Sequence, residues 1–105
     1  MNKNFGLSEK DFALLKNKLV NFLKDKENFK IYVFGSRGKG TERKYSDIDL
    51  WIESNPSLTA QEIANFLHDI EESDLTIKID LVTPDTCLNE YKARILNERV
   101  EWLKG

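Results

Sequence analysis

The stretch that decides the fold runs from Ile31 to Glu53 and reads IYVFGSRGKGTERKYSDIDLWIE. The start of this stretch belongs to a compact β-rich run, Phe29–Phe34, which predicts a strand that ends at a glycine. At its other end, Asp47–Glu53 alternates apolar and polar residues, which predicts a second strand with one buried face. The polar, glycine-bearing segment 36–46 separates the two. The stretch therefore predicts two strands joined by a polar loop.

Outward from this stretch, further amphipathic segments complete a mixed pattern of helices and strands. Apolar residues at helical spacing predict a helix over about 8–26, and a capping box at 59–62 opens a short second helix. A third strand is predicted over 76–83, followed by a last helix from about Pro84 to Asn97. Residues 100–103 fit either a continuation of that helix or a short edge strand. The expected fold class is α+β, with a small, mostly antiparallel or mixed sheet packed against helices in a single domain, 1–105.

Composition restricts the classes of function. The chain has 105 residues, a net charge of −2 and 32% charged residues, so it lacks the basic excess of a general nucleic-acid-binding protein. One cysteine, Cys87, and one histidine, His68, argue against a disulfide and against a zinc site. No apolar run approaches the roughly 20 residues of a membrane span, and the first residues do not resemble a secretory signal. We therefore expect a soluble, cytoplasmic protein with no direct nucleic-acid partner.

The loop after the first strand is basic. It carries Arg37, Lys39, Arg43 and Lys44 against the single acidic residue Glu42, a local charge of about +3 in an acidic chain. Backbone N–H groups of a glycine-rich turn that opens a helix bind anions, and neighbouring cations strengthen such a site. The loop is therefore a candidate phosphate site, although each of these charges is also compatible with an ordinary solvated loop.

Three aspartates lie on the predicted strands. Asp47 and Asp49 are two residues apart on one strand, so their carboxylates project from the same face about 7 Å apart. Asp80 occupies the polar face of another strand. If the two strands are neighbours, three carboxylates repel one another unless a cation is present, and Mg²⁺ with phosphate oxygens relieves that repulsion. The pattern favours metal-assisted phosphoryl or nucleotidyl transfer over a calcium site or a solvated strand edge.

The sequence does not match other phosphate-binding motifs or the serine-hydrolase triad. The segment 35–41 has the glycine spacing of a Walker loop, but Thr41 stands where the phosphate-binding lysine is needed. Arg43 replaces the third glycine of a dinucleotide fingerprint. Ser36 has no histidine near it in sequence, and His68 lies on the second predicted helix, which makes a serine-hydrolase triad improbable.

Gly35-Ser36, ten intervening residues and Asp47-Ile48-Asp49 form a GS-x10-DxD signature. The signature, with its flanking residues 33–37 and 46–50, resembles the minimal nucleotidyltransferase (MNT) branch of the DNA polymerase beta-like nucleotidyltransferase superfamily. The resemblance covers about Ile31 to Val82, and no residue of the motif is missing. It implies the nucleotidyltransferase fold.

The resemblance also implies a role for each matching residue. Asp47, Asp49 and Asp80 would be the catalytic, metal-binding carboxylates, holding two Mg²⁺ ions, with Asp80 also orienting or deprotonating the acceptor hydroxyl. The nucleotide-binding residues would be Gly35, Ser36, Arg37, Lys39 and Ser46. ATP would be the substrate, and attack on its α-phosphorus would leave AMP on the acceptor and release pyrophosphate.

The acceptor follows from the resemblance and from size. Only 22 residues come after Thr83, too few for the acceptor domains of larger relatives, so we expect a shallow acceptor site or one supplied by another chain. The resemblance implies a small helical HEPN-type toxin as partner and AMP transfer to it. Two alternatives stay open: a non-catalytic, partner-binding antitoxin, and a stand-alone adenylyltransferase for an antibiotic-type small molecule, for which a homodimer is possible. Trp51 fits either stacking on a base or packing beneath the last helix.

Overall fold

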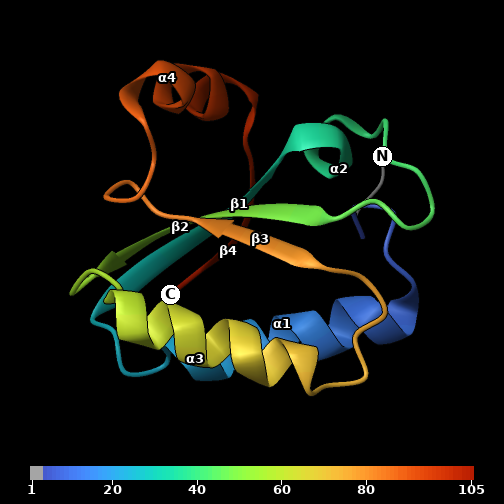
Figure 1. Cartoon of the computed structure of the whole chain (residues 1–105), viewed down its shortest axis with the longest axis horizontal. Coiled ribbons are helices and arrows are strands. Elements are labelled where there is room, and N and C mark those ends of the chain that lie inside the picture. The colour runs from blue at the N-terminus through green and yellow to red at the C-terminus, as the bar shows by residue number, and fades with distance from the viewer. Residues whose placement is uncertain (1–3) are drawn as a thin grey trace.

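The computed structural model describes residues 4–105. Helices and strands alternate along this range. In chain order (Figure 1) they are α1 (Glu9–Leu23), β1 (Asn28–Phe34), α2 (Gly35–Lys39), β2 (Ile48–Asn55), α3 (Ala60–Glu71), β3 (Ile79–Val82), α4 (Asn89–Glu98) and β4 (Val100–Lys104). The order matches the predicted sequence of elements, with a short helix added in the loop and a strand added at the end.

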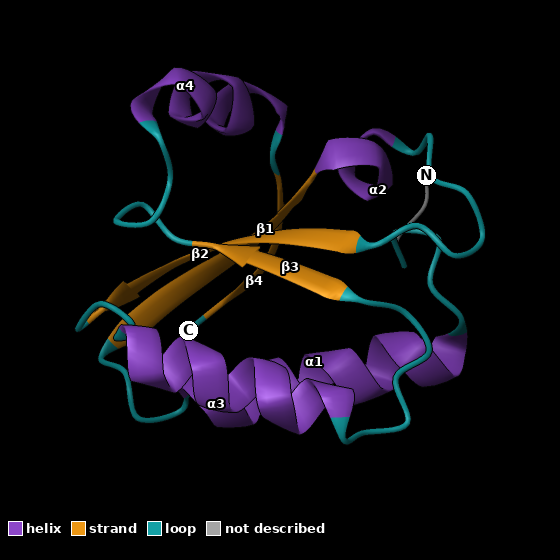
Figure 2. Cartoon of the chain, in the orientation of Figure 1, coloured by secondary structure: helices purple, strands orange, loops and turns teal. Residues whose placement is uncertain are grey.

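The four strands form one mixed sheet in the order β3-β2-β1-β4 (Figure 2). β1 is antiparallel to both β2 and β4, whereas β2 and β3 are parallel. The parallel pair is possible because α3 carries the chain back to the start of the next strand. The expected α+β class with a small mixed sheet is confirmed.

Helices cover both faces of the sheet. Figure 1 shows α1 and α3 together beneath one face, with α2 and α4 on the opposite face. The lower layer holds the main core, because the apolar residues of β1 and β2 alternate onto that face and meet the apolar stripe of α1. The completely or almost completely buried members of these elements are Leu15, Leu19, Leu23, Ile31, Val33, Ile48, Leu50 and Ile52.

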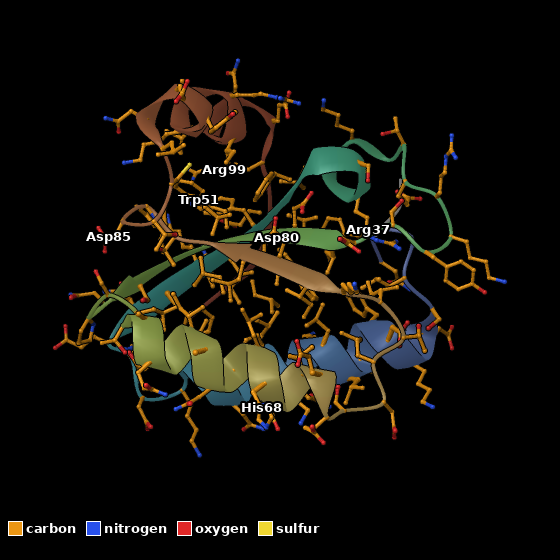
Figure 3. The ribbon with its side chains drawn as sticks, in the orientation of Figure 1. Arg37, Trp51, His68, Asp80, Asp85 and Arg99 are labelled. Atoms are coloured by element: carbon orange, nitrogen blue, oxygen red, sulfur yellow. The ribbon has the colours of Figure 1, made fainter. Side chains whose placement is uncertain are left out.

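The upper face carries a smaller apolar cluster beneath α4. Trp51 is 1% exposed and packs with Tyr32 and with Ile95 of α4 (Figure 3). Its indole Nε1 donates to Glu53 Oε2 at 3.0 Å. Of the two interpretations of Trp51, packing under the last helix is therefore the one that the structure supports. This cluster fixes α4 above the same sheet face that carries Asp49 and Asp80.

Several boundaries differ from those predicted. The third strand begins at Ile79 rather than at residue 76, because Thr76 is hydrogen-bonded to α1 instead of to the sheet. The Thr76 Oγ1 hydroxyl donates to Asp11 Oδ2 at 2.5 Å. The last helix begins at Asn89 rather than near Pro84, since Thr83 and Thr86 close a turn through their hydroxyl groups, 3.1 Å apart. Residues 100–104 form an edge strand beside β1, which decides between the two readings of that segment.

Within residues 4–105, no helix has the length and apolar character needed to cross a membrane.

Candidate active site

Asp49 and Asp80 are direct neighbours in the sheet. They are register partners across the parallel pair β2 and β3, and therefore stand side by side on one face. Figure 3 shows Asp80 on the side of the sheet that faces α2 and α4. The two strands that the sequence left unplaced relative to each other are thus adjacent, and the two carboxylates meet.

The charges of the three aspartates act on one another. Burial raises the pKa of the half-buried Asp49 carboxyl above its ordinary value, and repulsion from Asp80 and then from Asp47 raises it further. Asp47 itself is exposed and precedes the first residue of β2. The ionised Asp49 carboxylate is therefore destabilised by its burial and by its neighbours, and a bound cation would relieve the repulsion.

Gly35 lies directly against this cluster. It begins α2 with a φ of +70°, a conformation that residues with a Cβ rarely adopt. A Cβ placed at Gly35 would overlap Asp49 Oδ2. Both the backbone conformation and the close approach therefore require glycine, and they bring the turn over the carboxylate.

Ser36 continues this turn with its side chain free. Its backbone oxygen accepts from Thr41 N at 2.9 Å, which closes the helix after one turn. Within residues 4–105, its hydroxyl group has no hydrogen-bond partner. The hydroxyl is thus available to a ligand at the start of α2.

Arg37 is placed differently from the prediction. Its side chain is 2% exposed, and its guanidinium donates to three backbone oxygens: Ser46 O at 2.8 and 3.0 Å, Phe5 O at 2.9 Å and Lys44 O at 3.4 Å. Because the guanidinium N–H groups of Arg37 already donate to these carbonyls, the Arg37 side chain is not free to contact a phosphate. Arg37 instead ties the N-terminal turn to the loop that leads into Asp47 (Figure 3).

The remaining predicted residues of the loop divide into two kinds. Ser46 Oγ accepts from Arg43 N at 2.8 Å, so it closes the turn before Asp47. Lys39 is half-exposed, and its Nζ lies 3.2 Å from Glu98 Oε1 of α4. Lys39 is therefore the predicted loop cation whose ion pair reaches the side of the sheet where the aspartates stand.

A cleft of about 390 Å³ lies over the two carboxylates. Its floor contains Gly35, Asp49 and Asp80. Its opposite wall comes from α4 and the turn before it, with Thr86, Cys87, Leu88, Tyr91, Arg94, Ile95 and Glu98. A larger hollow of about 480 Å³ is lined by Lys30, Glu53 and Lys104 among others, and it holds no pair of carboxylates. The chemistry of the chain thus points to the cleft under α4.

The donor set fits a hard divalent cation that also binds phosphate. Among residues 4–105, no three acidic, histidine or cysteine side chains are gathered closely enough to hold a metal ion by themselves. Mg²⁺ typically takes one or two carboxylates and completes its octahedron with water and substrate phosphate oxygens. Asp49, whose carboxyl pKa is raised, and its neighbour Asp80 form a donor pair of this kind.

The wall of the cleft was not predicted. The sequence predicts the last helix but not which side of the sheet it covers, so Tyr91, Arg94 and Glu98 carried no signal of a site. Cys87, which the sequence analysis used only to argue against a disulfide and a zinc site, also lines the cleft. The available clue was that Trp51 and Asp49, two residues apart on one strand, share a face. This places a large apolar side chain on the carboxylate face, where a helix has to cover it.

Comparison with known proteins defines the class. A family model described as a nucleotidyltransferase domain matches residues 16–103, so this chain belongs to that family. Its relatives include the Haemophilus influenzae protein named "Probable protein adenylyltransferase MntA", 30% identical over 86 residues that make up 82% of this chain and 73% of the relative. The Methanocaldococcus jannaschii protein named "Putative protein adenylyltransferase MJ1217" is 35% identical over 96 residues, 88% of this chain and 92% of that protein. The predicted enzyme class, an adenylyltransferase of the minimal nucleotidyltransferase type, is confirmed.

Solved structures carry the same fold. A toxin-antitoxin crystal structure with AMP-PNP superimposes with a TM-score of 0.66 at 22% identity, over 84% of this chain and 72% of the other. The MntA-HepT toxin-antitoxin structure gives a TM-score of 0.58 at 19% identity, over 87% and 71% of the two chains. These likenesses confirm the nucleotidyltransferase fold.

Proposed function

We propose that this chain transfers AMP from ATP to a hydroxyl group of a partner protein, and that the partner is the HEPN-type toxin of a toxin-antitoxin pair. The observation that carries the proposal is the pairing of Asp49 with Asp80 beneath the Gly35 turn, at the floor of an open cleft. Because the proposed substrate is ATP, we place the reaction in the cytoplasm.

The residues that line the cleft and those of the adjoining loop have different roles in the transfer. Asp49 and Asp80, with Asp47 beside them, would hold two Mg²⁺ ions once oxygens of the triphosphate complete the coordination, and the ions would supply positive charge to the entering and leaving oxygens. The backbone at Gly35 and the free Ser36 hydroxyl hold the triphosphate, with Lys39 as a further cation. Arg37 and Ser46 act indirectly, by holding the loop that carries Asp47.

The reaction is a displacement at phosphorus. The acceptor oxygen bonds to the α-phosphorus of ATP, the bond from that phosphorus to the β-bridging oxygen breaks, and pyrophosphate leaves. The acceptor proton passes to the Asp80 carboxylate. Asp80 suits this role because it is exposed at the cleft, next to the more buried Asp49.

The form of the cleft supports a protein acceptor. Leu88 and Tyr91 on the α4 side of the cleft are 61% and 53% exposed, so the cleft has an apolar edge that no residue in 4–105 covers. Exposed aromatic and aliphatic side chains at the edge of a site favour contact with another protein. The structural relative in which MntA is paired with HepT as a toxin-antitoxin complex supports a toxin in that position.

The proposal is tested by searching the neighbouring reading frames for a small helical HEPN-type protein and incubating that protein with the chain, Mg²⁺ and ATP. Intact-mass measurement of the partner should show a gain of one or more AMP units. Asp49→Ala should abolish the gain, whereas the matched variant Asp85→Ala, at an exposed aspartate outside the cleft, should retain it.

Three other results would contradict the proposal. Toxin neutralisation that survives Asp49→Ala without any mass gain would identify a binding module. ATP consumption with an aminoglycoside, but not with the protein partner, would identify a small-molecule adenylyltransferase, and a homodimer that shares the acceptor site would agree with that result. A gain of mass with no divalent cation present would exclude the metal-dependent chemistry.

A further inference from the structure

Glu98, at the end of α4, lies between two cations at the cleft. Its Oε1 is 3.2 Å from Lys39 Nζ and 3.4 Å from Arg94 Nε. Glu98 and Arg94 both line the cleft that contains Asp49 and Asp80. A single carboxylate oxygen is thus shared by a cation of α2 and a cation of α4.

The other arginines beside the sheet are committed elsewhere. The Arg37 guanidinium donates to the backbone carbonyl oxygens of Phe5 and Ser46. Arg99 pairs with Glu53 at 2.6 Å and lies over the Tyr32 ring at 3.8 Å. Lys39 and Arg94, in contrast, are 45% and 67% exposed, and among residues 4–105 each has Glu98 as its only acidic partner. They are therefore the cations here that an incoming anion can recruit.

An ion pair of this kind exchanges readily. Solvent exposure screens the attraction between Glu98 and its partners, so each pair contributes little to stability. A triphosphate presents several charged oxygens to the same cations, and an arginine guanidinium can bind two of them at once. Such an anion competes well for Lys39 and Arg94.

We propose that the Glu98 carboxylate is a stand-in for the nucleotide phosphates: it holds Lys39 and Arg94 at the cleft, and the triphosphate displaces it when Mg-ATP binds. Arg94 then becomes a phosphate contact contributed by α4. Because Lys39 belongs to α2 and Glu98 to α4, displacement also uncouples the loop helix from the cleft wall. This inference rests on the proposed function and adds to it a competing anion and a second phosphate-binding cation.

The test measures binding of a nonhydrolysable ATP analogue with Mg²⁺ by calorimetry, at low and at moderate salt. Glu98→Gln removes the competing charge and should tighten binding by about two- to fivefold, the range of an exposed ion pair. Glu98→Asp keeps the charge on a shorter side chain and should give a smaller change. Arg94→Gln should weaken binding by a similar factor and reduce its salt dependence.

Glu90→Gln is the matched control, because Glu90 is an exposed glutamate in the first turn of the same helix and lies outside the cleft. It should leave the affinity unchanged. Weaker binding by Glu98→Gln would mean that Glu98 only positions Lys39, and unchanged binding would mean that no exchange occurs; either result overturns the inference while the proposed function stands. Failure of the unmodified chain to bind the Mg²⁺-nucleotide analogue would overturn the proposed function and the inference with it.

Discussion

Gly35 and the Asp49 carboxylate occupy adjoining space: the turn that opens α2 passes so close to Oδ2 of Asp49 that a single added methyl group would overlap it. The motif glycine and the second motif aspartate are fourteen residues apart in sequence. They meet because β1 and β2 are antiparallel, with Phe34, the residue before the glycine, opposite Asp49. The distance along the chain between the two halves of the motif is thus set by the loop needed to return from β1 to β2.

Gly35→Ala should damage both the fold and the site. The left-handed φ costs a residue with a Cβ roughly 1–2 kcal/mol, and the overlap with Asp49 displaces either the turn or the carboxylate. We expect at least a tenfold loss of Mg-ATP affinity together with a lower Tm. Gly40→Ala is a matched control, since Gly40 has a similar φ of +78° and nothing within 4 Å of its would-be Cβ. It should lower Tm by a similar strain cost with little effect on affinity. Equal losses of affinity in the two variants would contradict a special contact between Gly35 and Asp49.

Asp49→Asn should stabilise the chain in the absence of divalent cations. A raised pKa means that the folded state binds the Asp49 proton more tightly than the unfolded state does. The free energy of unfolding therefore falls as the pH rises from the ordinary pKa of the carboxyl through its raised value, and it stays lowered at neutral pH. With EDTA at pH 7 the variant should show the higher Tm, and the difference should vanish at a pH below the ordinary value.

Mg²⁺ should reverse this order. It stabilises the folded state of the unmodified chain by binding to the carboxylates, and it should raise the Tm of Asp49→Asn much less. The control is Asp85→Asn, which alters an exposed aspartate outside the cluster and should follow the unmodified chain in both conditions. A variant that is less stable than the unmodified chain in EDTA would contradict the destabilisation of the ionised Asp49 carboxylate by burial and by repulsion from Asp80 and Asp47.

Arg37→Gln should act on stability and on the loop together. It leaves the buried carbonyl of Phe5 and the partly buried carbonyl of Ser46 without their donors, and each such loss costs about 1–3 kcal/mol. Urea denaturation should therefore show a drop of at least about 2 kcal/mol in the free energy of unfolding. Arg43→Gln, at an exposed loop arginine, should change it by less than about 0.5 kcal/mol. If Arg37→Gln weakened nucleotide binding while leaving stability intact, the predicted phosphate contact would be restored and the anchoring role rejected.

The contrast between Arg37 and Asp80 marks the limit of what a sequence can predict here. Alternation along each strand correctly assigned the buried set Ile48, Leu50 and Ile52 to one face and Asp49 to the other, because strand geometry is local. Whether Asp80 met Asp49 depended on strand order, which the sequence left conditional and the parallel β2–β3 pair settles. For Arg37, a charged loop residue between glycines gives no sign that its side chain turns inward.

The wall of the cleft was beyond prediction for a related reason. Arg94 and Glu98 belong to a helix with a weak apolar stripe, whose position over the sheet is fixed by Ile95 meeting Trp51 and Tyr32. Such a contact joins residues more than forty positions apart, and the local pattern offers only Trp51 as a clue to it, without indicating which residues of the helix face the carboxylates. A functional wall made by a distant helix therefore appears only with the tertiary structure.

Trp51→Phe should separate packing from base recognition. The indole is buried between the sheet and α4 and donates to Glu53, so its replacement leaves a cavity and removes a hydrogen bond. We expect a loss of about 1–3 kcal/mol in the free energy of unfolding. Because the ring is covered, nucleotide affinity measured well below Tm should change by less than about twofold, a difference of under 0.5 kcal/mol. Tyr45→Phe, at an aromatic residue that is 72% exposed, is the control for the stability effect and should be silent. A large loss of nucleotide affinity in Trp51→Phe without a loss of stability would instead place the indole against the base, and the packing of α4 would then have to be reconsidered.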